Sequence, residues 1–148
     1  MSWAPHVTVA TVVEKEGRFL FVYEECDGRQ VYNQPAGHLE PNESLIEAAV
    51  RETLEETRWR VRPTALLGVG LYEAPANGIT YLRHTFVAEA LEECSALPLD
   101  DGIIEPRWLT REELLAKRDQ WRSPMVMDAV DDYLSGVRYP LELLHPRR

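Results

Sequence analysis

The segment from residue 37 to residue 59, GHLEPNESLIEAAVRETLEETRW, constrains the fold more than any other part of the chain. Ser44 and Glu47 form a capping box, in which each side chain satisfies an amide at a helix start. Apolar residues and threonines follow at offsets of three and four, at Ile46, Ala49, Val50, Thr53, Leu54 and Thr57. This spacing predicts a helix that begins near Ser44 and packs on a sheet through that stripe.

The same helix carries a group of acidic side chains beside the stripe. Glu52, Glu55 and Glu56 fall within an arc of roughly 100°. Like charges at this spacing cost only ~0.2–0.5 kcal/mol per pair, so energy alone does not exclude a merely solvated acidic face. Arg51 stands four residues from both Glu47 and Glu55, where it can pair with them and fix a carboxylate's direction. Carboxylate oxygens are hard ligands that suit Mg²⁺, or Mn²⁺ in its place, and these ions take phosphate oxygens into their remaining positions. The chemistry implied is phosphoryl or nucleotidyl transfer to water.

The rest of the chain reads as grouped strands with few helices. β-branched segments at 6–13 and 18–23, separated by Gly17, predict a hairpin. Further strands are expected at 30–34, 65–73, 81–90 and 107–109, and helices are expected from Thr110 and over 125–134. The sequence PAG at 35–37 predicts a change of direction followed by a loop. We predict an α/β sandwich with an antiparallel or mixed sheet, in a single domain over residues 1–148.

Composition limits the partners of such a domain. The formal net charge of -9 and the lack of a Lys or Arg run argue against large nucleic acids. No stretch approaches the ~20 apolar residues of a membrane span, and no secretory signal is evident. Cys26 and Cys94 are too few and too far apart for a disulfide framework, so we expect a cytoplasmic protein. A small phosphorylated substrate remains compatible, because a divalent cation can bridge carboxylates to phosphate.

One pattern in the segment from residue 37 to residue 59 matches a known family. Six residues stand at the fixed spacing of this family's motif, namely Gly37, Glu43, Arg51, Glu52, Glu55 and Glu56. With five residues after the glycine and seven after the first glutamate, this pattern resembles the Nudix box. The resemblance implies an α/β/α sandwich with a central mixed β-sheet. It also implies hydrolysis of a nucleoside diphosphate linked to another group.

Three positions depart from the family pattern. Arg58 stands where the family has a glycine after the last glutamate pair, and Thr53 and Trp59 occupy flanking aliphatic positions. A non-glycine residue in a left-handed helix end costs roughly 1 kcal/mol. These departures therefore put the helix end in question more than the metal site.

The resemblance also implies a role for each box residue. The metal ligands would be Glu52, Glu55 and Glu56, with the backbone oxygen of Gly37 at the turn. Arg51 would orient a carboxylate, and Glu43 would support the loop and the helix. The general base would be Glu52 or Glu55, and the sequence does not choose between them.

Segments beyond the box are similar to the NudJ-type branch of the family. They are PHVTVATVV near the start, NQPAGHLE before the helix, and RSPMV and SGVRYPLELL near the end. The resemblance therefore covers nearly the whole chain. It implies a Mg²⁺-dependent phosphatase of nucleoside di- and triphosphates that releases inorganic phosphate. Diphosphorylated thiamine-pathway pyrimidines and thiamine diphosphate are further implied substrates.

Substrate contacts are expected just before the box and on a later strand. Tyr32 would stack on a base while Asn33 and Gln34 hydrogen-bond its edge, with plain strand packing as the alternative. Arg83 would neutralise a terminal phosphate, as would Arg122 and Arg138 from the C-terminal segment. For each arginine the alternative is an ordinary surface ion pair.

Several other polar residues have two interpretations. Asp100, Asp101 and Glu105 precede the strand at 107–109, where Nudix enzymes often place an extra acidic ligand or base, but we favour a solvated loop. For His6 and His84 we favour structural roles over phosphate binding.

Two rival functions stay open. One is a pyrophosphatase of ADP-ribose or dinucleoside polyphosphates, which would release AMP rather than inorganic phosphate. The other is a Nudix-fold nucleotide sensor without turnover, which the intact Glu52, Glu55 and Glu56 argue against. We expect a monomer, with a weak dimer as the alternative.

Overall fold

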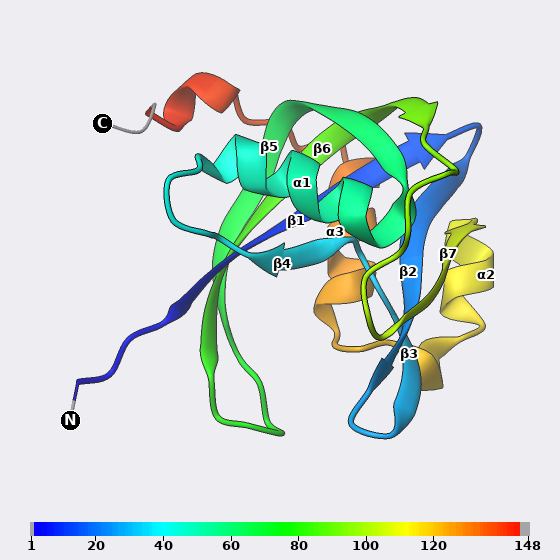
Figure 1. The fold of residues 1–148 in the computed structure, drawn as a ribbon, viewed down its shortest axis with the longest axis horizontal. Coiled ribbons are helices and arrows are strands. Elements are labelled where there is room, and N and C mark those ends of the chain that lie inside the picture. The colour runs from blue at the N-terminus through cyan, green and yellow to red at the C-terminus, as the bar shows by residue number, and fades with distance from the viewer. Residues whose placement is uncertain (1, 146–148) are drawn as a thin grey trace.

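The computed structural model describes residues 2–145, which form a seven-stranded sheet with helices on both faces (Figure 1). The strands are β1 (His6–Lys15), β2 (Arg18–Cys26), β3 (Arg29–Asn33), β4 (Ala36–His38), β5 (Trp59–Glu73), β6 (Thr80–Glu93) and β7 (Ile103–Leu109). The α-helices are α1 (Leu45–Thr57), α2 (Arg111–Leu115) and α3 (Met125–Leu134). A 3-10 turn at Arg118–Gln120 lies between α2 and α3, and another at Leu141–Leu143 follows α3. None of the helices within residues 2–145 is long and apolar enough to cross a membrane.

The sheet is mixed, as predicted. Its strands run in the order β3-β2-β1-β6-β5, with β4 paired to β1 and β7 paired to β2. β1 and β6 are parallel, and the other pairs are antiparallel. The predicted hairpin of β1 and β2 is confined to its turn, where Glu14 and Lys15 pair with Phe19 and Arg18. Upstream of this turn, β1 pairs with β6 and β4, which brings the segment before α1 onto the sheet.

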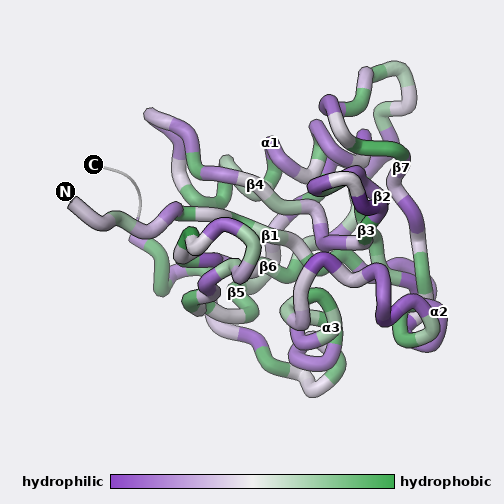
Figure 2. The backbone as a smooth tube through the Cα atoms, turned by 90° about the horizontal axis from the view of Figure 1, so that it is seen from below, coloured by the Kyte–Doolittle hydropathy of each residue, from purple (hydrophilic) through white to green (hydrophobic). Residues whose placement is uncertain are grey.

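The helices cover opposite faces of the sheet, and Figure 2 shows these layers with α1 and α3 on either side. Ala48 and Ala49 of α1 pack on Val9 and Phe86. On the other face, α2 and α3 contribute to the larger buried cluster, which includes Val12 and Phe21 of the sheet. Alternation along β1 explains the division, because Val9 and Val12 point to opposite faces. The α/β/α sandwich is confirmed.

Helix α1 begins and packs as its sequence predicts. Both bonds of the capping box are present, from Glu47 N to Ser44 Oγ at 3.0 Å and from Ser44 N to Glu47 Oε1 at 2.8 Å. Thr53 is fully buried, yet its hydroxyl donates to the Ala49 carbonyl at 2.7 Å. The same hydroxyl lies 2.8 Å from Thr11 Oγ1 of β1. A threonine therefore replaces an aliphatic residue here without leaving a buried hydroxyl unpaired.

The helix ends in the left-handed conformation that usually favours glycine. Arg58 has φ 66° and its amide donates to the Leu54 carbonyl. Its side chain offsets part of the strain, because Nε donates to the Leu97 carbonyl at 2.7 Å. The departure from the family pattern thus leaves the geometry of the helix end in place, with an arginine that ties it to the loop before β7.

Candidate active site

Helix α1 and the loop before β7 bring three carboxylates together. Oxygen atoms of Glu52, Glu55 and Asp100 all lie within 4.8 Å of one another. The Asp100 amide also donates to the Glu55 carbonyl at 3.2 Å, which fixes the loop against the helix end. Asp100 is exposed, as we expected for a solvated loop, but its carboxylate lies next to the two glutamates of α1. Glu105 instead pairs with Arg107 at 2.6 Å.

Arg51 orients the cluster through several carboxylates at once. Its Nη1 atom lies 2.7 Å from Glu52 and 2.8 Å from Glu55, as the predicted orienting role requires. Its Nη2 and Nε atoms donate hydrogen bonds to the Glu43 carboxylate at 2.8 and 3.0 Å, and these bonds lower the pKa of Glu43. The predicted pair between Arg51 and Glu47 was wrong, because the Glu47 carboxylate accepts the N-cap amide of the helix.

Glu56 is the most enclosed of the predicted metal ligands. Its carboxylate accepts the Ala36 amide of β4 at 2.9 Å, and burial raises the pKa of Glu56 to about 9. Burial also raises the pKa of Glu52, an effect that hydrogen bonding to Arg51 partly opposes. Both groups line the same cavity. The helix thus directs two carboxyl groups toward β4, in surroundings where their negative charge is poorly solvated.

Gly37 is required for space and not for a turn. It lies within β4 opposite Val9, and it is absent from the positive-φ residues of the described chain. A Cβ atom at this position would meet the carboxyl carbon of Glu52 at 2.1 Å. The expected change of direction is found as a bend at Pro35, between β3 and β4, but it involves no turn at Gly37. The missing side chain makes room for the carboxylate, so a larger residue here would displace Glu52.

A cavity of about 810 Å³ adjoins the carboxylates, a volume that suits a nucleotide-sized ligand. Glu52 and Glu56 contribute acidic groups to its lining, and Arg83 and Arg122 contribute cations. Arg122 is paired with Glu24 at 3.0 Å. Arg138, the third predicted phosphate ligand, bonds instead to backbone carbonyls of the α3 end.

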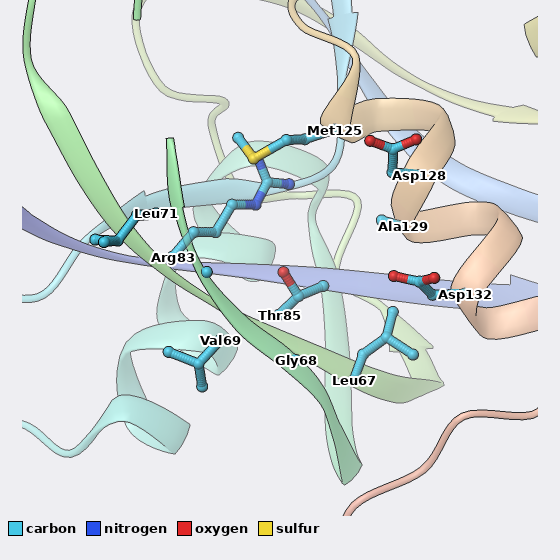
Figure 3. A pocket seen from close by; sticks show the side chains of 11 residues that line it. Leu67, Gly68, Val69, Leu71, Arg83, Thr85, Met125, Asp128, Ala129 and Asp132 are labelled. Carbon is cyan, nitrogen blue, oxygen red and sulfur yellow. The ribbon is translucent and has the colours of Figure 1, made fainter. Parts of the chain in front are cut away.

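Arg83 is a buried cation, and no carboxylate of the described residues pairs with it. It is 9% exposed and forms no ion pair within residues 2–145, so the alternative of a surface ion pair was wrong. Its Nη2 donates to Gln34 Oε1 at 3.0 Å, and Gln34 in turn donates to the Val126 carbonyl at 2.7 Å. Burial lowers the pKa of Arg83 to about 10, which keeps it charged at neutral pH. Figure 3 shows its guanidinium beside Met125. Arg83 lines both the large cavity and a smaller one of about 190 Å³.

Tyr32, Asn33 and Gln34, which were predicted to contact a base, do not all face the cavity. Along β3, Val31 and Asn33 line the cavity while Tyr32, between them, faces the core. Tyr32 is 1% exposed, its ring centroid lies 4.8 Å from that of Tyr23, and its hydroxyl accepts a hydrogen bond from Arg107. Stacking of Tyr32 on a base was therefore a wrong prediction, because consecutive strand residues cannot all face one side.

The cavity lining contains residues that sequence reasoning missed. His38, Tyr72 and Tyr81 contribute rings to it. The two tyrosines form a cross-strand pair. The turn signal at Asn77 and Gly78 predicts a hairpin, and its register would place these two tyrosines opposite each other. The histidines singled out from the sequence lie beside this lining. His84 Nδ1 is 3.1 Å from the Thr8 carbonyl, and His6 contacts the His38 ring.

Comparisons with known proteins cover this whole arrangement. The NUDIX domain family matches residues 3–129, which include all residues that line the large cavity. Proteins named Phosphatase NudJ from Shigella boydii serotype 4 (strain Sb227) and Escherichia coli (strain K12) are each 44% identical over 140 residues, covering 95% of this chain and 90% of theirs. A NUDIX hydrolase structure from Nitrosomonas europaea is 42% identical with a TM-score of 0.95, covering 97% of this chain and 98% of that chain.

Proposed function

Because this chain belongs to the NUDIX family of hydrolases, which act on phosphorus-containing anhydrides, we propose that its substrates are nucleoside di- and triphosphates. The reaction would depend on Mg²⁺, with Mn²⁺ as a substitute, and would release inorganic phosphate. The name Phosphatase NudJ of its relatives supports release of phosphate over release of a nucleoside monophosphate. Diphosphates of the thiamine pathway, including thiamine diphosphate, are proposed as further substrates.

One observation carries this proposal, namely the opposition of charge across one cavity. Carboxylates from α1 line it together with Arg83, a buried cation without a carboxylate partner in the described chain. An isolated buried charge is costly, and an anion bound beside it offsets that cost. A polyphosphate satisfies both groups, because it can contact the arginine directly and the carboxylates through a divalent cation.

The carboxylate cluster fits a divalent cation. Three carboxylate oxygens within 4.8 Å of one another form a hard donor set, and Gly37 leaves the space that the Glu52 carboxylate occupies. The proposed ligands are Glu52, Glu55 and Glu56, the Gly37 backbone oxygen, and Asp100, which joins the set because of its position. When bound, Mg²⁺ supplies a Lewis acid that polarises a phosphoryl oxygen and makes water a better nucleophile.

The protein's own residues divide the remaining work. Arg51 holds Glu52 and Glu55 in one orientation through a shared nitrogen. One of these two carboxylates accepts the proton of the attacking water, as general-base catalysis requires. Arg83, held by Gln34, binds the phosphate oxygens and fixes the position of the substrate's polyphosphate group. Arg51 is thus a positioning residue, whereas Arg83 contacts the substrate.

A screen of phosphate release tests the proposal. Purified protein is supplied with Mg²⁺ and with nucleoside di- and triphosphates, thiamine diphosphate, ADP-ribose and dinucleoside polyphosphates in turn. Products are identified by mass, and EDTA controls show the dependence on metal. Release of inorganic phosphate from nucleotides supports the proposal. AMP from ADP-ribose or dinucleotides would assign the pyrophosphatase activity instead, and nucleotide binding without turnover would assign a sensor.

A further inference from the structure

The cavity has an aromatic wall that the proposed hydrolysis does not use. Tyr81 of β6 pairs with Tyr72 of β5 on one side and with His6 of β1 on the other, so three rings form a row across the sheet. The neighbouring row on the same face contains Thr8 and Arg83, which pair directly. Residues two apart on a strand are separated by about 7 Å. The aromatic row therefore lies one step along the sheet from the proposed phosphate-binding arginine.

Within this wall, Tyr81 is held by two histidine rings. The centroid of Tyr81 lies 5.8 Å from that of His6 and 6.2 Å from that of His38, both in edge-on geometry. The Tyr81 hydroxyl accepts a hydrogen bond from Asn77 in the adjoining turn at 3.3 Å. Tyr72 and Tyr81 are part of the cavity lining. A wall of rings already in place can stack on a planar ligand with little loss of side-chain entropy.

The same cavity contains the largely buried side chain of Asn33. Asn33 is 7% exposed, and its Oδ1 atom has no hydrogen-bond partner within residues 2–145. Leaving a buried amide unpaired is unfavourable, and native structures rarely do so without a reason. Asn33 and Val31 project from the same side of β3 into the cavity. A ligand with hydrogen-bonding groups on its edge would satisfy this amide.

We propose that the row of Tyr72 and Tyr81, with His38 beside it and Asn33 also in the cavity lining, is the subsite for the heterocyclic base of the substrate. This inference rests on the proposed function and assigns the part of the cavity that binds the planar heterocycle of those substrates. The base stacks on the tyrosines, and Asn33 hydrogen-bonds its edge through an N–H donor of the base. The ribose spans the step between the aromatic row and Arg83. Inorganic polyphosphates and simple sugar phosphates, which have no aromatic ring, would lack these contacts.

Equilibrium binding in EDTA tests the subsite without relying on turnover. The wild-type protein is expected to bind a nucleoside diphosphate at least about tenfold more tightly than inorganic pyrophosphate, because stacking on an aromatic side chain is worth this much. Equal affinities for the two ligands would overturn the proposal. If the binding difference is found but no nucleotide is hydrolysed, the proposed function fails while the subsite stands.

Tyr81→Leu and Tyr81→Phe separate stacking from the hydroxyl group. Tyr81→Leu is expected to weaken nucleoside diphosphate binding about tenfold and to leave pyrophosphate binding unchanged, whereas Tyr81→Phe keeps most of the affinity. In turnover assays the loss should be seen in KM and not in kcat. Tyr139→Leu is the matched control, since this tyrosine is 50% exposed and lies outside the cavity lining. A parallel loss of pyrophosphate affinity in Tyr81→Leu would indicate a structural role and overturn the proposal.

Asn33→Ala tests recognition of the base edge. Its nucleotide affinity is expected to fall about fivefold to tenfold, with the differences among the four common bases reduced, while pyrophosphate affinity is unchanged. Its melting temperature should not fall, because the variant removes an unpaired buried amide and a structural role would lower it. Unchanged affinity for all four bases would remove Asn33 from the subsite.

Discussion

The site has an acidic region, formed by Glu52 and Glu55 with Arg51, and a cationic region, formed by Arg83 with Gln34. These two regions are built in opposite ways. Glu52, Glu55 and Arg51 come from successive turns of one helix, and their charges contact one another. Arg83 and Gln34 are 49 residues apart in sequence, and the arginine has no carboxylate partner in the described chain. The acidic region therefore has an excess of negative charge that a cation would offset, and the cationic region has a positive charge that an anion would offset. This difference indicates that the phosphates of the substrate lie between them.

Neutralising a carboxylate of the acidic region should have the largest effect. Glu55→Gln and Glu52→Gln keep the shape of the side chain but remove its charge. We expect each to lower kcat on the order of 10²–10³-fold while the melting temperature changes little. Steady-state kinetics with the best nucleotide substrate measures the loss.

Glu112→Gln serves as the control for these variants, since Glu112 lies in the first turn of helix α2 and outside the cavity lining. It should retain wild-type activity. Undiminished turnover in Glu52→Gln and Glu55→Gln would contradict the role assigned to the acidic region. A joint collapse of activity and melting temperature would point to a structural role instead.

Removing the positive charge of Arg83 in the cationic region should affect substrate binding. Arg83→Met is expected to lower kcat/KM about tenfold to hundredfold, because it deletes charge-assisted hydrogen bonds to phosphate. Its melting temperature should hold or rise, since an unpaired buried charge is removed. Arg83→Lys should recover part of the activity. Equal activity of Arg83→Met and wild-type protein would contradict the comparison, because the cationic region would then have no anion to bind.

Asp100 tests how far the acidic region extends beyond the helix. Asp100→Asn should raise the Mg²⁺ concentration needed for half-maximal activity about tenfold, with little change in the rate at saturating metal. Asp101→Asn is a matched control from the neighbouring position and should behave as wild type. A metal titration of activity checks both variants, and identical curves for them would remove Asp100 from the site.

The smallest effect is expected at the end of α1. Arg58→Gly relieves a left-handed residue but loses the bond to the Leu97 carbonyl, so stability should change by less than about 1 kcal/mol. Arg58→Ala loses the bond and keeps the strain, so it should be the less stable of the two. Thermal unfolding would compare the variants, and activity should be unchanged in both. A loss of activity would show that the helix end also shapes the acidic region.

The acidic region was largely predictable because its geometry is local. Helical spacing alone placed Glu52 and Glu55 together, and the capping box gave the start of α1. The approach of Asp100 to these carboxylates depends instead on how the loop before β7 returns to the helix end. Helical periodicity carries no information about that contact.

The cationic region was predictable only in its parts. Arg83 and Gln34 were both named from the sequence, but the bond between them depends on the parallel pairing of β1 with β6 and on the position of α3. Tyr32 was placed wrongly because alternation along β3 directs neighbouring residues to opposite sides. The strand register, which a single sequence specifies weakly, decides which rings line the cavity.

The most direct test of the account is whether the acidic region binds a divalent cation at all. Mn²⁺ titration of the wild-type protein, followed by the electron paramagnetic resonance signal of the free ion, measures this without substrate or turnover. We predict saturable binding by the wild-type protein, binding weakened at least tenfold in Glu52→Gln and Glu55→Gln, and wild-type binding in Glu112→Gln. Equal Mn²⁺ binding by all four proteins would contradict the assignment of these carboxylates as the metal site.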